Sequence, residues 1–350
     1  MRLFLLSLLL WVRFSHAAAD GQLHLYWIDS EGGGSTLLVT PAGESILIDC
    51  GNPGGRDAQR ILHVAKNVAG LERLDHVVIT HFHGDHFGGL ADLATLMPIG
   101  TLYDKGVPQQ SPDGKPKDMR WTLMRRPYLD ASVEKRVTLA AADVLPLKQT
   151  ETPLSLRCLC ANQRIIAPSP EQASLRNPLT GTVEAKPVDP SDNANSLVLL
   201  LRFGDFDFFD GGDLTWNVEE KLVCPHDVVG PVDLYQVDHH GLPTSNHPSL
   251  IRTLNPTVSV MNNGPRKGTA PETLAALRSA PALQAMYQVH HNVRDEATSE
   301  TEPERIANTS ESGDACPAYF IHATVQADGG SFLVEVPSTG HRQTYVCRAP

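Results

Sequence analysis

The spacing of hydrophobic and polar residues is typical of strands in some segments of the chain and of helices in others. Short apolar runs end in glycine or acidic residues, which is typical of buried strands closed by turns. Amphipathic segments lie between several of these runs, so a layered α/β protein with its site at the edge of the sheets is predicted. Strands are expected at 23–28, 36–40, 45–49, 74–80, 97–104, 144–147, 154–161, 196–201, 205–210, 232–237, 257–261, 286–289, 319–326 and 332–336, and helices at 57–68, 88–96, 128–136, 249–254 and 271–279.

The first 19 residues have the pattern of a secretory signal. A charged start precedes an apolar core and a small-residue cleavage site, so we expect export to a secreted or periplasmic location. The alternative is a membrane-anchored N-terminus. No other stretch is apolar and long enough to span a bilayer, and no membrane span is expected in the mature chain. Residues 20–350 would then form one domain, with a long loop insertion at about 104–190.

Composition narrows the class of protein. The chain is 41% hydrophobic and 20% charged, which is enough for a large core. Its formal net charge of −11 argues against an extended nucleic-acid surface, although metal ions could still attract a small anionic substrate. The six cysteines have no C-x-x-C zinc spacing. Cys316 and Cys347 flank the last expected strands and could form a disulfide. Cys50 is interpreted as a buried free thiol.

One short motif carries the strongest chemical signal. His81, His83, Asp85 and His86 have an H-x-H-x-D-H spacing directly after the apolar run at 77–79. Imidazole and carboxylate are ligands that zinc prefers, and the following glycines allow a sharp turn. Such a turn could aim His81 and His83 at one ion and Asp85 and His86 at a second. The alternative is a histidine-rich surface loop.

Further polar residues follow later strands in the same manner. Asp213 follows two glycines, and it either bridges two ions or caps a helix. His239 and His240 follow another strand. Adjacent residues at a strand end should point in opposite directions, so one would bind metal and the other would contact a ligand residue or substrate. Asp49 is expected to orient a ligand histidine, and His290 is a candidate for a catalytic, substrate-binding or structural role.

These residues carry a family resemblance. The stretch 80–89 is very similar to the signature of the metallo-β-lactamase superfamily of metallo-hydrolases. The order of the segments 30–39, 46–51, 195–199, 211–213 and 239–241 looks like the hydrolase domain of the competence protein ComEC and of related secreted stand-alone proteins. The resemblance covers residues 22–336.

The resemblance implies an αββα sandwich with a two-metal centre. Zinc is the first expectation, with manganese or iron as alternatives. Many members add a histidine ligand before the bridging aspartate, but no histidine lies between 98 and 213 here. Water, Asn193 or Asn195 would therefore complete the ligand set of the first ion. ComEC-type domains also tend to have a Gly-His-Pro where residues 264–271 contain no histidine. The implied ligands are His81 and His83 for one ion, Asp85, His86 and His240 for the other, and Asp213 as the bridge.

The resulting hypothesis is a secreted metal-dependent hydrolase. A metal-activated water would attack a phosphodiester or related ester, with a small molecule as another possible substrate. Asp85 or Asp213 would accept the proton, and His239 or His290 would contact the substrate. The alternatives are a lactam or thioester hydrolase of the same fold, or a non-catalytic metal-binding protein. The sequence gives no oligomeric state.

Overall fold

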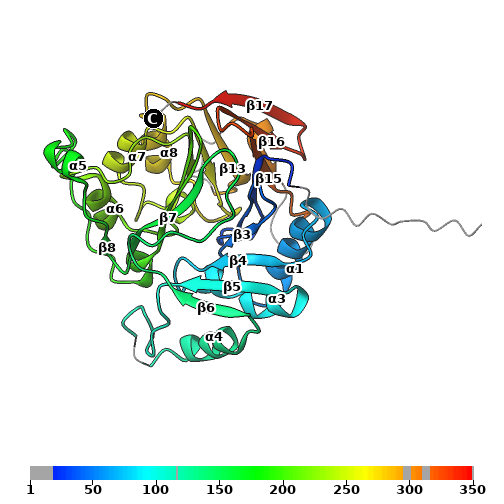
Figure 1. Cartoon of the computed structure of the whole chain (residues 1–350). Coiled ribbons are helices and arrows are strands. Elements are labelled where there is room, and N and C mark those ends of the chain that lie inside the picture. The colour runs from blue at the N-terminus through cyan, green and yellow to red at the C-terminus, as the bar shows by residue number, and fades with distance from the viewer. Residues whose placement is uncertain (1–18, 116, 295–300, 310–315, 349–350) are drawn as a thin grey trace, which may run out of the picture.

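The first sheet joins the two ends of the chain (Figure 1). The structure, a computed structural model, describes residues 19–115, 117–294, 301–309 and 316–348. Within them, the strands of this sheet are β1 (Leu23–Trp27), β2 (Thr36–Val39), β3 (Ser45–Ile48), β4 (Leu74–Val78), β5 (Ile99–Asp104), β6 (Lys135–Thr138), β15 (Ile321–Val325), β16 (Ser331–Val336) and β17 (His341–Val346). Their spatial order is β17-β16-β15-β1-β2-β3-β4-β5-β6, with parallel pairing from β3 to β6.

The second sheet is built from the following part of the chain. Its strands are β7 (Leu154–Ala161), β8 (Arg164–Ile165), β9 (Val198–Phe203), β10 (Phe206–Asp210), β11 (Leu234–Gln236), β12 (Val258–Met261), β13 (Ala285–His290) and β14 (Ile306–Asn308). Their order is β14-β13-β12-β11-β10-β9-β7-β8, and the pairing is parallel from β10 to β14. Parallel strands place their carboxyl ends at one edge, where loops can gather polar side chains.

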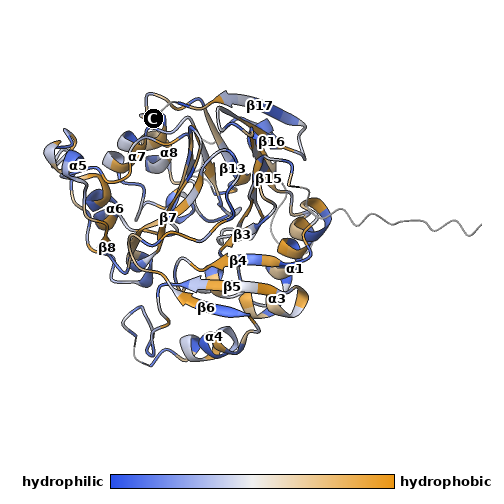
Figure 2. Cartoon of the chain, in the orientation of Figure 1, coloured by the Kyte–Doolittle hydropathy of each residue, from blue (hydrophilic) through white to orange (hydrophobic). Residues whose placement is uncertain are grey.

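Helices cover the outer faces of both sheets (Figure 1). They are α1 (Arg56–Leu62), the π-helix η1 (His63–Val68), α2 (Gly84–Phe87), α3 (Leu90–Leu96), α4 (Met119–Asp130), α5 (Pro170–Ser174), α6 (Trp216–Val223), α7 (Pro248–Leu254) and α8 (Pro271–Arg278), with short 3-10 turns η2 (Asp192–Asn195), η3 (Asp238–Gly241) and η4 (Pro303–Arg305). Hydrophobic and polar residues alternate along them, as expected for helices with one face on a sheet (Figure 2).

Three hydrophobic layers hold these elements together in the described part of the chain. The central layer lies between the sheets, where Trp27 packs edge to face on Phe208 with ring centroids 6.2 Å apart. One outer layer joins the first sheet to α1, α3 and α4, and includes Ile61 and Leu93. The other joins the second sheet to α6, α7 and α8. This arrangement confirms the predicted αββα sandwich.

Several local predictions need correction. The helix expected at 128–136 is wrong, because α4 ends at Asp130 and β6 begins at Lys135. The strand expected at 144–147 is only an isolated bridge between Val144 and Arg157. Strand β17 was not predicted, because its outward residues are polar and only alternate positions touch the core. The segment 104–190, expected as a loop insertion, contributes β6 and β7 to the two sheets.

The remaining general predictions have mixed outcomes. Cys347 is a buried free thiol, so its predicted pairing with Cys316 is not formed, whereas Cys50 is a buried thiol as expected. Among the described residues, no helix is both long enough and apolar enough to cross a membrane. The predicted signal at 1–19 lies, apart from its last residue, outside the described residues. It stays a prediction.

Candidate metal centre

The H-x-H-x-D-H motif lies where β4 ends at the edge of the first sheet. His81 is fully buried just after the strand, and the single turn of α2 carries Asp85 and His86. This turn packs closely on the loop after β3, since a Cβ at Gly89 would lie 2.1 Å from the carbonyl oxygen of Cys50. Glycine is therefore required at this contact. The close packing fixes the direction in which the ligand side chains point.

The second sheet supplies the other half of the centre from the loops after β10 and β11. Asp213 is buried beyond the left-handed Gly212, which has a φ of 57°. His239 and His240 also lie in the left-handed region, with φ values of 52° and 57°. The predicted opposite orientation of these two histidines assumed an extended backbone and is wrong. Because the backbone coils here instead, both imidazoles reach Asp213.

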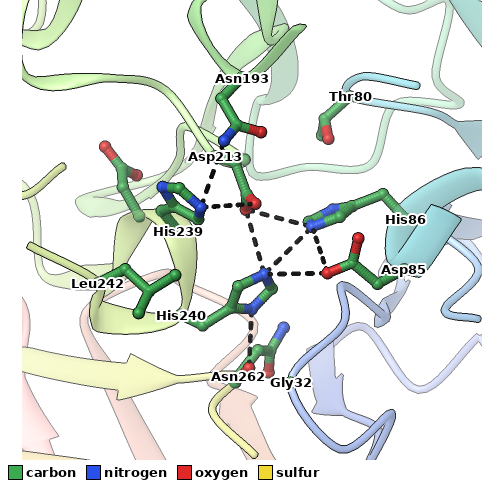
Figure 3. A network of polar contacts seen from close by, with 12 residues as sticks. Gly32, Thr80, Asp85, His86, Asn193, Asp213, His239, His240, Leu242 and Asn262 are labelled. Carbon is green, nitrogen blue, oxygen red and sulfur yellow. Dashed lines mark hydrogen bonds and ion pairs between the residues drawn. The ribbon is translucent and has the colours of Figure 1, made fainter. Parts of the chain in front are cut away.

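The two oxygens of Asp213 face different histidines (Figure 3). Oδ1 lies 3.2 Å from Nε2 of His86 and 3.4 Å from Nε2 of His240. Oδ2 lies 3.4 Å from Nε2 of His239 and 3.8 Å from Nε2 of His81. A carboxylate with this arrangement can bridge two metal ions, one on each oxygen.

The distances around Oδ1 of Asp213 match those of a metal coordination shell. The Nε2 atoms of His86 and His240 are 3.2 Å apart, and Oδ2 of Asp85 lies 3.9 and 3.7 Å from them. A tetrahedral zinc site with ligand bonds of 2.0–2.1 Å has its ligand atoms roughly 3.3 Å apart. A second group of possible metal ligands consists of His81, His83 and Asp213, whose ligand atoms lie within 4.8 Å of one another. The structure thus brings together all six predicted metal ligands.

Each histidine of the centre uses its outer ring nitrogen for another contact. This leaves the second nitrogen for a ligand, and it is the usual way in which proteins orient metal-binding imidazoles. The pairs are His86 Nδ1 with Asp49 Oδ2 at 2.7 Å, His240 Nδ1 with the carbonyl of Asn262 at 2.9 Å, His239 Nδ1 with Ser245 Oγ at 3.0 Å, His81 Nδ1 with Thr80 Oγ1 at 3.1 Å, and His83 Nε2 with Asp113 Oδ1 at 2.9 Å.

At the centre itself, one of the buried histidine nitrogens has no hydrogen-bond partner among the described residues. Nε2 of His81 is inaccessible to solvent and accepts or donates no hydrogen bond there. A buried polar atom without a partner is costly, and at this position, 3.8 Å from Asp213 Oδ2, a metal ion would satisfy it. Asp49 has the orienting position that was predicted for it: it also accepts hydrogen bonds from the amide and hydroxyl of Thr80, at 2.8 and 2.7 Å.

The charges of the centre favour a cation. Burial lowers the pKa of His86, but Asp213, Asp49 and Asp85 outweigh burial and raise that pKa well above its ordinary value. Burial dominates at His239 and lowers its pKa to about 4, so this imidazole is neutral. The carboxylates thus favour a positive charge at this position, either the proton on His86 or a divalent metal ion that replaces it, because the ligands of a metal ion must be deprotonated. The donor set is suitable for zinc and also for manganese or iron.

Two charged neighbours of the centre, Asp113 and Lys267, were not predicted from the sequence. Asp113 comes from a polar loop, and its hydrogen bond with His83 lowers the pKa of its carboxyl to about 2. Lys267 lies in the histidine-free segment 264–271. Its ammonium group contacts Asp85 Oδ2 and donates to the carbonyl of Gly32 at 2.7 Å. Neither residue follows a strand end, which is the pattern that identified the other candidates.

Three further candidates lie at different positions relative to the centre. Asn193 reaches it, with Nδ2 3.3 Å from Nε2 of His239, whereas Asn195 instead binds Asp192 at 3.1 Å. His290 does not contact the predicted ligands. Its Nε2 lies 2.6 Å from Oδ1 of Asp29, in a separate buried group. The geometry therefore gives His290 no contact through which it would act on substrate.

Comparisons with known proteins agree with this architecture. Residues 29–151 match the family model of the metallo-beta-lactamase superfamily. The chain is 48% identical over 62 residues to an octanoyltransferase of Porphyromonas gingivalis, covering 18% of this chain and 11% of that protein. It is 34% identical over 100 residues to a ribonuclease Z of Alkaliphilus oremlandii, covering 29% of each. These matches thus span less than a third of either relative.

A solved structure is similar over a larger part of the chain. The metallo-beta-lactamase fold protein YhfI of Bacillus subtilis has a TM-score of 0.46 and 11% identity, covering 76% of this chain and 96% of that one. The residues matched by the family model contain the H-x-H-x-D-H ligands. Beyond them, the described residues complete two mixed sheets with helices on the outer faces. The chain thus has the metallo-beta-lactamase fold, and its residues 29–151 are similar to the metallo-beta-lactamase superfamily.

Proposed function

We propose that this chain is a metal-dependent hydrolase that uses a metal-activated water on a phosphodiester or a related ester. The observation that carries the proposal is Asp213, whose two oxygens face separate sets of ligands. The match to a ribonuclease Z favours a phosphodiester, as does the ComEC-like order of motifs. The predicted signal at 1–19 adds the proposal that the protein acts outside the cytoplasm.

The side chains of the centre have distinct tasks in such a reaction. Bound metal ions would lower the pKa of a shared water toward neutrality and stabilise a developing oxyanion. Asp213 and Asp85 lie within the ligand set, where either carboxylate can accept the proton of that water. Lys267 keeps 35% of its side chain exposed beside Asp85, so its ammonium can meet an anionic substrate from solvent.

A panel of substrates with and without chelator tests the proposal. The wild type should hydrolyse bis-p-nitrophenyl phosphate in a chelator-sensitive reaction. The double variant His83→Ala/His86→Ala should lose turnover by more than about 100-fold, because changes in the outer partners alone cost about 10–100-fold. His63→Ala/His226→Ala is the matched control, since neither histidine contacts a predicted ligand, and it should retain wild-type turnover.

The same panel separates the alternatives. Faster turnover of nitrocefin or of a thioester than of bis-p-nitrophenyl phosphate would assign the centre to lactam or thioester hydrolysis. Turnover that persists in chelator would contradict the metal dependence of the proposed hydrolase, and no turnover of any of the three substrates would favour a binding protein.

A further inference from the structure

The first ion of the predicted pair lacks one histidine in the sequence. Members of the superfamily that this chain resembles often supply it from a position before the bridging aspartate, where this chain has none. We propose that His239 is the third histidine ligand of this first ion. The inference rests on the proposed function, because it assigns a ligand to the metal centre of that hydrolase.

The position of His239 relative to Asp213 supports the assignment. Its Nε2 lies 3.4 Å from Oδ2 of Asp213, the oxygen that faces His81 at 3.8 Å. Both distances are close to the roughly 3.3 Å between ligand atoms of a tetrahedral zinc site. The ring of His83 lies beside that of His81, with centroids 4.8 Å apart. His239 and His81 thus face the same oxygen of Asp213, and His83 belongs to the same group as His81 and Asp213.

The hydrogen bonds of His239 leave the correct nitrogen available. Nδ1 lies 3.0 Å from the hydroxyl oxygens of both Ser245 and Thr244. When Nδ1 carries the proton and donates it to a hydroxyl, the lone pair of Nε2 points toward Asp213. Nδ2 of Asn193 lies 3.3 Å from the same Nε2, so this nitrogen carries a lone pair, and a bound ion would take the place of Asn193 as its partner. Serine and threonine therefore orient His239 as Asp49 orients His86.

The burial of His239 argues against a role in binding substrate. The side chain is 10% exposed, whereas that of Lys267, on the other side of the centre, is 35% exposed. The left-handed backbone of His239 and His240 also turns both rings inward. As a result, two consecutive residues serve different ions, with Asp213 between them.

Metal analysis of single variants tests the assignment without relying on turnover. The full chain would be equilibrated with buffered zinc, and bound zinc would be measured by inductively coupled plasma mass spectrometry. His239→Ala should hold one zinc ion fewer than the wild type. His226→Ala, which removes a histidine from outside the centre, should hold as many as the wild type. Ser245→Ala/Thr244→Val should keep the ion but bind it about 10–100-fold more weakly in chelator competition.

A cysteine variant distinguishes a lost ligand from a damaged fold. In His239→Cys, cobalt in place of zinc should regain full occupancy and show a thiolate-to-cobalt charge-transfer absorption that the wild type lacks. Wild-type zinc content in His239→Ala, or no such absorption in His239→Cys, would overturn the assignment. A wild type that binds no metal would instead contradict the proposed hydrolase itself.

Discussion

At the scale of single residues, the loop that holds His81 and His83 depends on a buried ion pair outside the ligand set. Lys105 donates to Asp192 at 2.7 Å, and both side chains are almost fully buried. The other oxygen of Asp192 accepts the backbone N–H of Phe82, which lies between the two histidines, at 2.7 Å. The ion pair therefore fixes the backbone from which both ligands extend.

Lys105→Met should lower the free energy of unfolding by about 3–5 kcal/mol, because it leaves the negative charge of Asp192 buried without its cation. Chemical denaturation followed by circular dichroism would measure this loss. Adding Asp192→Asn should recover part of it, since the buried charge is removed. In the exposed pair Arg126–Asp130, at 3.5 Å, Arg126→Met should change stability by less than about 1 kcal/mol. Equal effects of the two single changes would contradict this view.

The sequence predicts ligands better than it predicts their supports. His81, His83, Asp85 and His86 can be recognised because their spacing is local and follows one strand. The partners that hold them come from distant segments. Lys105 and Asp192 are separated by 87 positions, and they share no motif with the ligands they support. Pairings of this kind depend on how the sheets pack, which periodicity does not reveal.

At the scale of elements, adjoining strands of the second sheet place two acidic side chains together. Asp207 lies in β10, and Asp233 directly precedes β11. Burial raises the pKa of Asp207 to about 6; Arg202, at 3.6 Å, lowers it, and Asp233 raises it further. The folded protein therefore binds a proton here more tightly than the unfolded chain, whose aspartate pKa is about 3.9.

This difference predicts how stability depends on pH. The contribution of Asp207 is present below about pH 4 and is lost as pH rises through about 6, because the charged form is disfavoured in the folded state. Asp207→Asn should therefore stabilise the protein by about 1–2 kcal/mol at pH 8 and by much less at pH 4, after allowance for partial exposure. Urea unfolding at both pH values would measure it.

The control for this prediction is an aspartate on a helix. Asp130→Asn, at the exposed end of α4, should leave the pH dependence of unfolding as in the wild type. The same stabilisation by Asp207→Asn at both pH values would mean that a proton does not account for the effect.

Helices and strands could be predicted where hydrophobic residues recur at regular spacing. Turns were missed where the local backbone conformation determines the structure. The central strands and the helix at 271–279 could be placed because buried positions repeat regularly. The turn at His239 and His240 could not, because two consecutive left-handed residues other than glycine leave no mark in hydrophobic periodicity. This one turn decides whether one or two histidines face the centre.

At the scale of the whole molecule, strands from the first and last parts of the described chain lie side by side in the first sheet. Strand β1 pairs with β15 in antiparallel register, so that Leu23 lies opposite Val325. On its other side β1 pairs with β2. The strand is therefore internal to the sheet and fully paired only when residues from both ends of the chain are present.

A chain truncated after Ala318, which lacks β15, β16 and β17, should aggregate, because the apolar edge of β1 is left unpaired. A chain that ends at Ser338 loses only the outermost strand β17 and should remain soluble, with a lower melting temperature. Size-exclusion chromatography of the soluble fractions would compare the two forms. A soluble monomer of the shorter form with native circular dichroism would contradict the prediction.

The pairing of β1 with β15 also affects how the protein is made on the ribosome. Roughly 300 residues must be synthesised after β1 before its partner emerges, which takes about 15–60 s at the usual rates of translation. During this interval the apolar strand has a neighbour on one side only. A chaperone that binds extended apolar segments would therefore find β1 accessible on the nascent chain, and would leave this strand once β15 has paired with it.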